Sequence, residues 1–305
     1  PEHVGLPQKS TRRGSRPAGR RMSVPTAARA WCNSLSLKLE RIKGIPQWHL
    51  NGFMTFFATE GRFYTMQLPR QWLVVRLSAL GDIALTTGVL DRWNRLHGWR
   101  FTFLVFSQWA SVLEGHPAID RIVGVSRDDV RAASMLRLFR SLSSDLAGYG
   151  LIDLHGSLRS RLLRLVWPGP VFHYPKYSME RRLFLRSGGR LCREKLLQYN
   201  VPQRYALSLD EVAPERGEVL PRIFLSEAER EDATAILQSR GIAEGKGLVA
   251  LHPYSTHANK AWRPENWLVL TRMLLAEGYR VLVVGRGERI FGEMPEVHDL
   301  TGVTT

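Results

Sequence analysis

The chain of 305 residues is long enough for two domains, and its 44% apolar residues can fill a sizeable core. Its apolar runs are too short to span a membrane, and Cys32 and Cys192 suggest neither a disulfide framework nor a zinc motif, which fits a reducing cytosol. The net charge is +15, and residues 1–65 contribute +8 of it through 11 Lys/Arg and 3 Asp/Glu. This surplus can attract nucleic acid, anionic lipid or phosphorylated substrates.

Residues 1–30 are rich in Arg, Ser, Pro and Gly and show no apolar periodicity, so we expect residues 1–65 to be a disordered basic extension. Met66 is a plausible natural start, because α/β patterning begins five residues later. Nucleic-acid binding through residues 9–43 is an alternative that rests on charge alone. Without an aromatic-interleaved basic motif, zinc spacing or recognition helix, we expect no specific nucleic-acid partner.

From residue 71 onward, short β-branched runs alternate with amphipathic stretches, which predicts a parallel sheet covered by helices on both faces. The expected strands are 72–77, 100–106, 121–125, 151–154 and 171–174, and the expected helices are 83–97, 107–114, 130–147 and 157–166. The sequence therefore predicts a doubly wound domain over residues 66–215.

A Pro- and charge-bearing stretch, 211–221, is predicted to link this domain to a second one over residues 216–305. There the alternation resumes with helix 226–240, strand 247–252, helix 264–277, strand 280–284 and a further strand near His298. Two or three strands cannot close a well-buried parallel sheet, so we expect this second domain to be incomplete.

The first informative stretch, 74–87, is a buried strand followed by a small-residue turn and a helix. Ligands of open α/β sheets gather at such strand ends, where Gly81 permits close approach and Asp82 can act as a general base toward a sugar hydroxyl. The alternative is that Asp82 is only a helix N-cap. A single glycine in this turn disfavours a dinucleotide-binding dehydrogenase.

The second informative stretch, 252–267, also follows a strand and precedes a helix. Its hydroxyls, Ser255 and Thr256, and the ammonium group of Lys260 can hold a diphosphate. The alternative is a polar surface loop before a helix that begins at Pro264.

Together these stretches resemble glycosyltransferase family 9, whose best-known members transfer heptose from an ADP-sugar to the inner core of lipopolysaccharide. The resemblance covers about residues 71–305 in the same order and spacing. It rests on Arg76–Thr87, Asp153–Ser160, Lys260–Trp262 and Asp299–Gly302.

The resemblance implies a GT-B fold, in which two Rossmann-like doubly wound domains face a cleft, the second being incomplete here. Residues 66–215 would form the acceptor-side domain and residues 216–305 a partial nucleotide-sugar-binding domain. It implies a bacterial, inverting heptosyltransferase that needs no metal and no cofactor beyond its ADP-heptose donor. Asp82 would be the catalytic base.

The resemblance also implies binding roles. Ser255, Thr256 and Lys260 would hold the donor diphosphate, and Glu288 would contact the nucleoside ribose. The acceptor, a lipopolysaccharide or lipid A core, would contact Ser78, Gly81, Arg159, Arg161, Lys176 and Arg181. The four basic residues among them have a simpler alternative as a solvated basic face. The expected location is the cytoplasm, with peripheral contact at the inner membrane.

The sequence departs from the family pattern at His155, where Gln is usual, at Tyr254, where Gly is usual, and at Arg263, where Pro is usual. The family's D-x-G-x-x-H motif has no counterpart before Thr305. Two alternatives therefore stay open: a truncated, catalytically inactive family member, or a member that uses a different sugar donor or acceptor.

Overall fold

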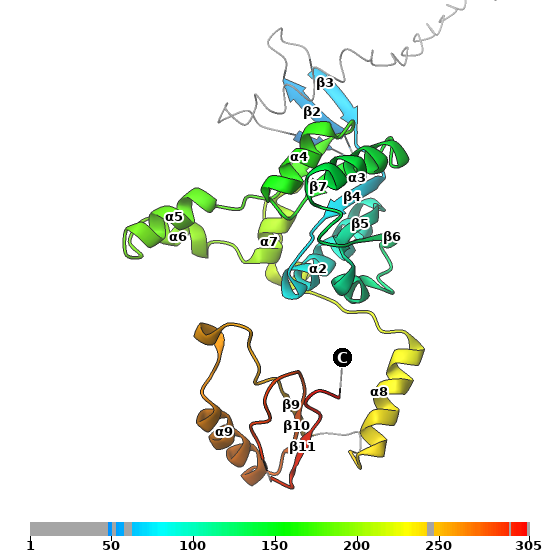
Figure 1. The fold of residues 1–305 in the computed structure, drawn as a ribbon. Coiled ribbons are helices and arrows are strands. Elements are labelled where there is room, and N and C mark those ends of the chain that lie inside the picture. Colours follow the sequence, from blue (N-terminus) through cyan, green and yellow to red (C-terminus); the bar gives the residue numbers. More distant parts are fainter. Residues whose placement is uncertain (1–47, 51–52, 58–62, 243–246, 293, 304–305) are drawn as a thin grey trace, which may run out of the picture. The chain divides into compact units, whose positions relative to one another are not determined.

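The computed structural model describes residues 48–50, 53–57, 63–242, 247–292 and 294–303 (Figure 1). The chain divides into two compact units between Phe224 and Leu225. The sequence predicts this boundary nine residues earlier, at 215/216. Each unit contains its own parallel sheet, and the predicted GT-B class of two α/β units is confirmed at this level.

The first unit is built on a five-stranded parallel sheet with the order β6-β5-β4-β7-β8. All five strands predicted for this domain are present, with ends that differ by at most two residues: β4 (Gln71–Val75), β5 (Arg100–Phe106), β6 (Ile119–Val125), β7 (Gly150–Asp153) and β8 (Val171–His173). The strand order reverses between β4 and β7, so ligands are expected at the carboxyl ends of these two strands.

Alternating residues of β4 enter two separate cores. Trp72 and Val74 pack in the core that α2 (Leu80–His97), the 3-10 helix η1 (Ser107–Leu113) and α7 (Val201–Ala206) cover. Leu73 and Val75 pack in the core that α3 (Ala132–Asp145) and α4 (Leu158–Val166) cover. Because both faces of the sheet are covered by helices, the predicted doubly wound arrangement is confirmed for this unit.

A helical hairpin that the sequence analysis missed follows β8. It consists of α5 (Ser178–Arg186) and α6 (Arg193–Leu197), and Figure 1 shows it extending away from the sheet of the first unit. Neither helix contains a buried residue. α5 has nine residues and α6 has five, so both are shorter than the windows over which helical periodicity is recognised.

Residues 216–224 belong to the first unit and are not a free linker, so the linker predicted over 211–221 is wrong for its second half. Val219 of the 3-10 helix η2 (Arg216–Val219) is buried in the first core. A Cβ atom added to Gly88 of α2 would lie 2.2 Å from the carbonyl oxygen of Leu220. The backbone N–H of Arg222 donates to Thr87 Oγ1 at 2.9 Å.

Three strands lie in the segment that the sequence analysis assigned mostly to a disordered extension. They are β1 (Trp48–Leu50), β2 (Phe53–Phe57) and β3 (Phe63–Gln67), and they pair as an antiparallel sheet. The prediction of disorder is therefore wrong for these ranges, where aromatic residues favour strands. Residues 1–47 lie outside the described residues.

The second unit contains a three-stranded parallel sheet with the order β11-β10-β9, formed by β9 (Leu248–Leu251), β10 (Arg280–Val283) and β11 (Val297–Asp299). Val281 and Val283 pack with residues of α9 (Pro264–Ala276). Leu282 packs on the other side with residues of α8 (Glu227–Ser239). Over the described residues, neither unit has a helix with the length and apolar character needed to cross a membrane.

Candidate active site

The point where the strand order reverses is bridged by the side chain of Arg76. This residue follows β4 and is only 8% exposed. Its Nη1 donates to the carbonyl oxygen of Leu154, which follows β7, at 2.7 Å, while its Nη2 forms an ion pair with Asp82. The guanidinium carbon lies 5.7 Å from the ring centroid of buried Tyr205. One arginine therefore connects the ends of both strands to the carboxylate that the sequence selects as a base.

Asp82 lies in the first turn of α2, which begins at Leu80 with Ala79 as its N-cap residue. The interpretation of Asp82 as the N-cap is therefore wrong. Its side chain is 41% exposed. Among the described residues, and apart from the chain neighbours and the nearby backbone of α2, no atom lies within 4 Å of a Cβ built on neighbouring Gly81. The result is an oriented carboxylate that a ligand can reach from solvent.

A buried turn follows β7 on the other side of the reversal point. Asp153 is fully buried, and its Oδ1 accepts from the backbone N–H groups of His155, at 2.9 Å, and Gly156, at 2.8 Å. Burial, and next the positive charge of Arg76, lower the pKa of His155 to about 4. His155 is therefore neutral at pH 7, in a position where the family usually has an uncharged Gln.

Lys176 fastens the chain after β8 to this turn. Its ammonium donates to the carbonyl oxygens of His155, at 3.3 Å, and Gly156, at 3.2 Å. Burial lowers the pKa of Lys176, and the positive charges of Arg76, Arg181 and Arg161 lower it further. Three predicted acceptor residues, Arg161, Lys176 and Arg181, therefore lie close enough to one another and to Arg76 for the other three charges to act on the Lys176 ammonium.

A cavity of about 560 Å³ opens at the same edge of the sheet. Two predicted acceptor residues, Ser78 and Arg159, line it together with residues that lie at or after the ends of β5 and β6. Its lining consists of Ser78, Ala79, Phe106, Gln108, Trp109, Arg127, Arg131 and Arg159. Three guanidinium groups around one cavity favour an anionic ligand.

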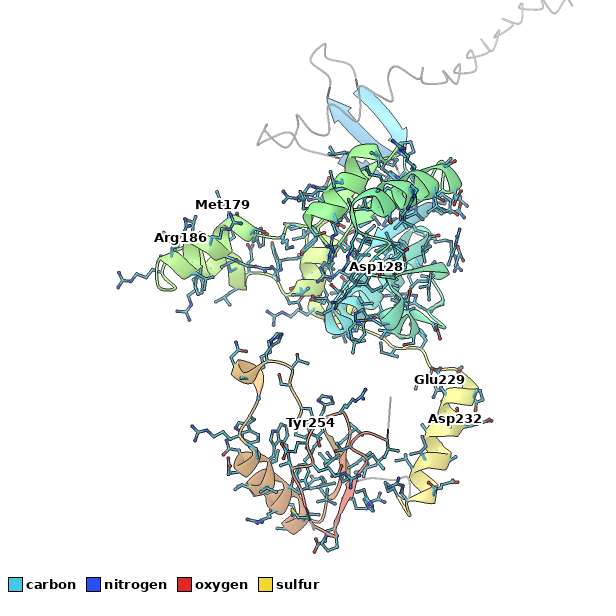
Figure 2. All side chains as sticks on the ribbon, in the orientation of Figure 1. Asp128, Met179, Arg186, Glu229, Asp232 and Tyr254 are labelled. Atoms are coloured by element: carbon cyan, nitrogen blue, oxygen red, sulfur yellow. The ribbon has the colours of Figure 1, made fainter. Side chains whose placement is uncertain are left out.

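Arg127 and Arg131 are candidate functional residues that the sequence analysis did not select. They flank Asp128, labelled in Figure 2, in the segment between β6 and α3, and Arg131 forms an ion pair with Asp128 at 2.8 Å. The available signal was their place just after a strand, since the carboxyl ends of parallel strands share one edge.

The predicted donor residues lie in the second unit, on loops that follow two paired parallel strands. Ser255, Thr256 and Lys260 follow β9 and Glu288 follows β10, and all four side chains are exposed. Ser255 Oγ donates to the carbonyl oxygen of His257 at 3.1 Å and accepts from its N–H at 3.2 Å, which stabilises the turn. Both loops leave the carboxyl ends of paired parallel strands. That the four residues bind one ligand stays a prediction.

Tyr254, labelled in Figure 2, fills the space beside the loop after β10. A Cβ atom added to Gly287 would lie 2.2 Å from its ring, and one added to Gly285 would lie 2.9 Å away. Its hydroxyl is 2.6 Å from Thr301 Oγ1. The ring therefore packs directly on the backbone after β10, at the position where the sequence departs from the Gly that the resemblance leads us to expect.

No family model and no curated protein sequence matches the chain. Solved structures do match it. A glycosyltransferase family 9 structure from Veillonella parvula aligns with a TM-score of 0.57 and 17% identity, over 76% of this chain and 69% of that one. The E. coli ADP-heptose LPS heptosyltransferase II aligns with a TM-score of 0.54 and 15% identity, over 77% and 73%. The chain thus has the fold found in solved family 9 glycosyltransferases, in agreement with the sequence resemblance.

Proposed function

We propose that the chain is an inverting glycosyltransferase that moves heptose from ADP-heptose to the inner core of lipopolysaccharide. The observation that carries this proposal is the accessible Asp82 carboxylate, held by Arg76 at the reversal point of the sheet. The fold shared with the two aligned transferases supports the reaction class. The sugar and the acceptor come from the sequence resemblance.

In the proposed reaction, Asp82 removes the proton from an acceptor hydroxyl while that oxygen attacks the anomeric carbon of the donor sugar. The bond from this carbon to the diphosphate breaks, and the electron pair leaves with ADP, so configuration at the carbon inverts. Arg76 orients the carboxylate, because its planar guanidinium is fixed at the same time by the Leu154 carbonyl. A base held within reach of the proton contributes about a hundredfold or more to the rate.

The acceptor is proposed to bind through its anionic groups. Arg127, Arg131 and Arg159 line the cavity, and Lys176 adds a further positive charge near Arg76. Charge-assisted hydrogen bonds from arginine suit phosphate and carboxylate groups of a lipid A core. An anionic acceptor would offset the positive charge of these groups, and an uncharged acceptor would not.

The donor is proposed to bind in the second unit, with its diphosphate at Ser255, Thr256 and Lys260 and its ribose at Glu288. The ammonium of Lys260 would neutralise charge on the departing diphosphate, the role that metal ions fill in many transferases. We propose that no metal or further cofactor takes part.

A second candidate function is binding without turnover, as in a catalytically inactive family member. The packing of Tyr254 on Gly285 and Gly287 favours it, because the ring occupies space beside the proposed diphosphate loop. A different sugar donor is a variant of the main proposal, since the proposed residues define a base and a diphosphate site and leave the sugar open.

The deciding experiment measures ADP release from ADP-heptose with deep-rough lipopolysaccharide as acceptor. Asp82→Asn is compared with Asp145→Asn, an exposed carboxylate near the end of α3. We expect release by the wild type and by Asp145→Asn only. If ADP is released from ADP-glucose and not from ADP-heptose, the proposed donor sugar is wrong. If ADP-heptose binds and no ADP is released, the result favours the second candidate function, binding without turnover.

A further inference from the structure

The α5–α6 hairpin, defined as residues 178–197, exposes many large apolar side chains. Figure 2 shows Met179 and Arg186 on its outer surface. The exposed fractions of its large aliphatic side chains are 67% for Met179, 43% for Leu183, 76% for Leu185, 54% for Leu191 and 66% for Leu197. An exposed apolar cluster of this kind on an element without any buried residue indicates a surface that something else covers.

The same hairpin is strongly basic. It holds six Lys/Arg and two Glu, and one of these acidic residues, Glu180, is paired with Lys195 at 2.5 Å. Arg181, Arg182, Arg186, Arg190 and Arg193 are exposed. Arginines interleaved with exposed leucines complement an anionic lipid interface, where apolar side chains enter the acyl boundary and guanidinium groups meet the headgroups.

The distribution of the apolar side chains favours a lipid surface over a folded partner. Met179 and Leu183 are four residues apart and lie on one side of α5, whereas Leu185 lies on a different side. Because these three side chains point to more than one side of α5, a fluid lipid interface can accept them more readily than a rigid protein surface. The hairpin is also held by the Glu180–Lys195 pair and by the Lys195 ammonium 5.1 Å from the Tyr177 ring centroid.

We propose that the α5–α6 hairpin docks the first unit on an anionic phospholipid membrane. This assignment deepens the proposed function and rests on it for its purpose, since a lipid-linked acceptor lies in such a membrane. The chain from β8 to the hairpin includes Lys176, whose ammonium donates hydrogen bonds to the carbonyl oxygens of His155 and Gly156 in the turn after β7. Docking at the hairpin therefore brings the membrane to the acceptor side of the candidate site.

The test is co-sedimentation of the full chain with vesicles made of phosphatidylglycerol and phosphatidylcholine in equal parts, and with phosphatidylcholine vesicles. The apolar variant replaces the three most exposed large apolar side chains of the hairpin with serine, and its control replaces three exposed apolar residues elsewhere. The charge variant and its control replace three exposed arginines each with glutamine. The apolar sets are Met179, Leu185 and Leu197 against Leu96, Leu136 and Met273; the charge sets are Arg182, Arg186 and Arg190 against Arg137, Arg140 and Arg272.

We expect wild type and both controls to bind the anionic vesicles, and the apolar variant to bind at least about tenfold more weakly. The charge variant should lose about fivefold for each arginine removed and should lose its preference for the anionic vesicles. Unchanged binding in both hairpin variants overturns the proposal, because the basic segment 1–65 is intact in them. Absence of wild-type binding also overturns it, as does a hairpin-dependent dimer seen by light scattering without vesicle binding.

Transfer to a water-soluble acceptor fragment separates this proposal from the proposed function. If the chain is a transferase that docks by the hairpin, the apolar variant keeps its rate on the soluble fragment and loses rate on acceptor in vesicles. If transfer fails for every acceptor while the hairpin still controls vesicle binding, the proposed function fails and the docking assignment stands.

Discussion

The guanidinium of Arg76 holds the carboxylate of Asp82 and, through a second nitrogen, the carbonyl oxygen of Leu154. The contact with Leu154 joins the ends of β4 and β7, where the strand order reverses, and the contact with Asp82 adds the start of α2. A carboxylate fixed in this way loses little freedom when an acceptor binds. The proposed roles of the two residues can therefore be tested separately: Asp82 takes the acceptor proton, and Arg76 orients the Asp82 carboxylate.

Asp82→Asn should lower kcat for sugar transfer by about a hundredfold or more, because an amide cannot accept the acceptor proton. Affinity for the donor should stay unchanged, since its proposed contacts lie in the second unit. Steady-state kinetics and calorimetric ADP-heptose binding check both points, with Asp145→Asn as the matched control. Retained turnover in Asp82→Asn removes this residue from its role.

Arg76→Lys should lower kcat about tenfold with little change in KM, because a lysine cannot reproduce the two-sided contact of the guanidinium. The unfolding free energy should fall by about 1 to 3 kcal/mol, since Arg76 is buried and the Leu154 carbonyl loses its partner. Denaturant titration and kinetics measure the two effects. Exposed Arg137→Lys on α3 is the control, and an equal kcat in both variants contradicts the orienting role.

His155 should make the folded protein less stable in mild acid. Its pKa is about 6.5 when unfolded and about 4 when folded, so the unfolded state binds more protons between these values. Stability contributed by neutral His155 is complete above pH 6.5 and decreases as the pH falls toward 4, by about 1 to 2 kcal/mol after allowance for partial exposure. Denaturant titrations at several pH values should show a smaller pH dependence of the unfolding free energy in His155→Gln than in the wild type, with exposed His257→Gln as the control.

Tyr254→Gly should strengthen ADP binding about tenfold, equivalent to about 1.4 kcal/mol, because the ring no longer occupies space beside Gly285 and Gly287. Tyr254→Phe keeps the ring and loses only the hydroxyl contact with Thr301, so it should bind ADP like the wild type. Calorimetry compares the three proteins. Weaker ADP binding by Tyr254→Gly alone would instead identify the ring as a ligand contact.

Gly88→Ala should destabilise the protein by about 1 to 3 kcal/mol, because the added methyl group would meet the backbone at Leu220. Gly81→Ala, in the same helix but facing open space, should raise stability by about 0.5 to 1 kcal/mol. Thermal and denaturant unfolding of the two variants test the packing of residues 216–224 on α2. Similar unfolding free energies would contradict it.

The sequence predicted the parallel sheets well, because buried strands of this kind are continuous apolar runs with clear ends. The bounds of β5 were predicted as observed, Arg100–Phe106. The α5–α6 hairpin was missed because its helices, of nine and five residues, are shorter than the windows over which periodicity is recognised. Segment 211–221 was predicted as a linker because its Pro and charged residues outnumber its apolar ones, although Val219 is buried in the first core.

The residues of the candidate site differ in how the sequence indicated them. Asp82 was selected from its own strand-turn-helix segment, and its catalytic role stays a prediction. Ser78 and Arg159, which the family resemblance implied, lie in separate segments and line one cavity. Arg127 and Arg131 come from a separate segment after β6, and their proximity depends on β6 lying two strands from β4. Sequence spacing alone carries no information about such a neighbour.

Because residues 216–224 pack on α2, a shorter polypeptide that contains only the first unit has to include them. A chain ending at 215 would uncover the hollow filled by Val219 and leave the Thr87 hydroxyl without the Arg222 amide. A chain ending at Phe224 retains both contacts, together with the ring of Phe224 4.9 Å from that of His116. Limited proteolysis should accordingly trim the protein back to the region after Phe224 and spare the peptide bonds before it.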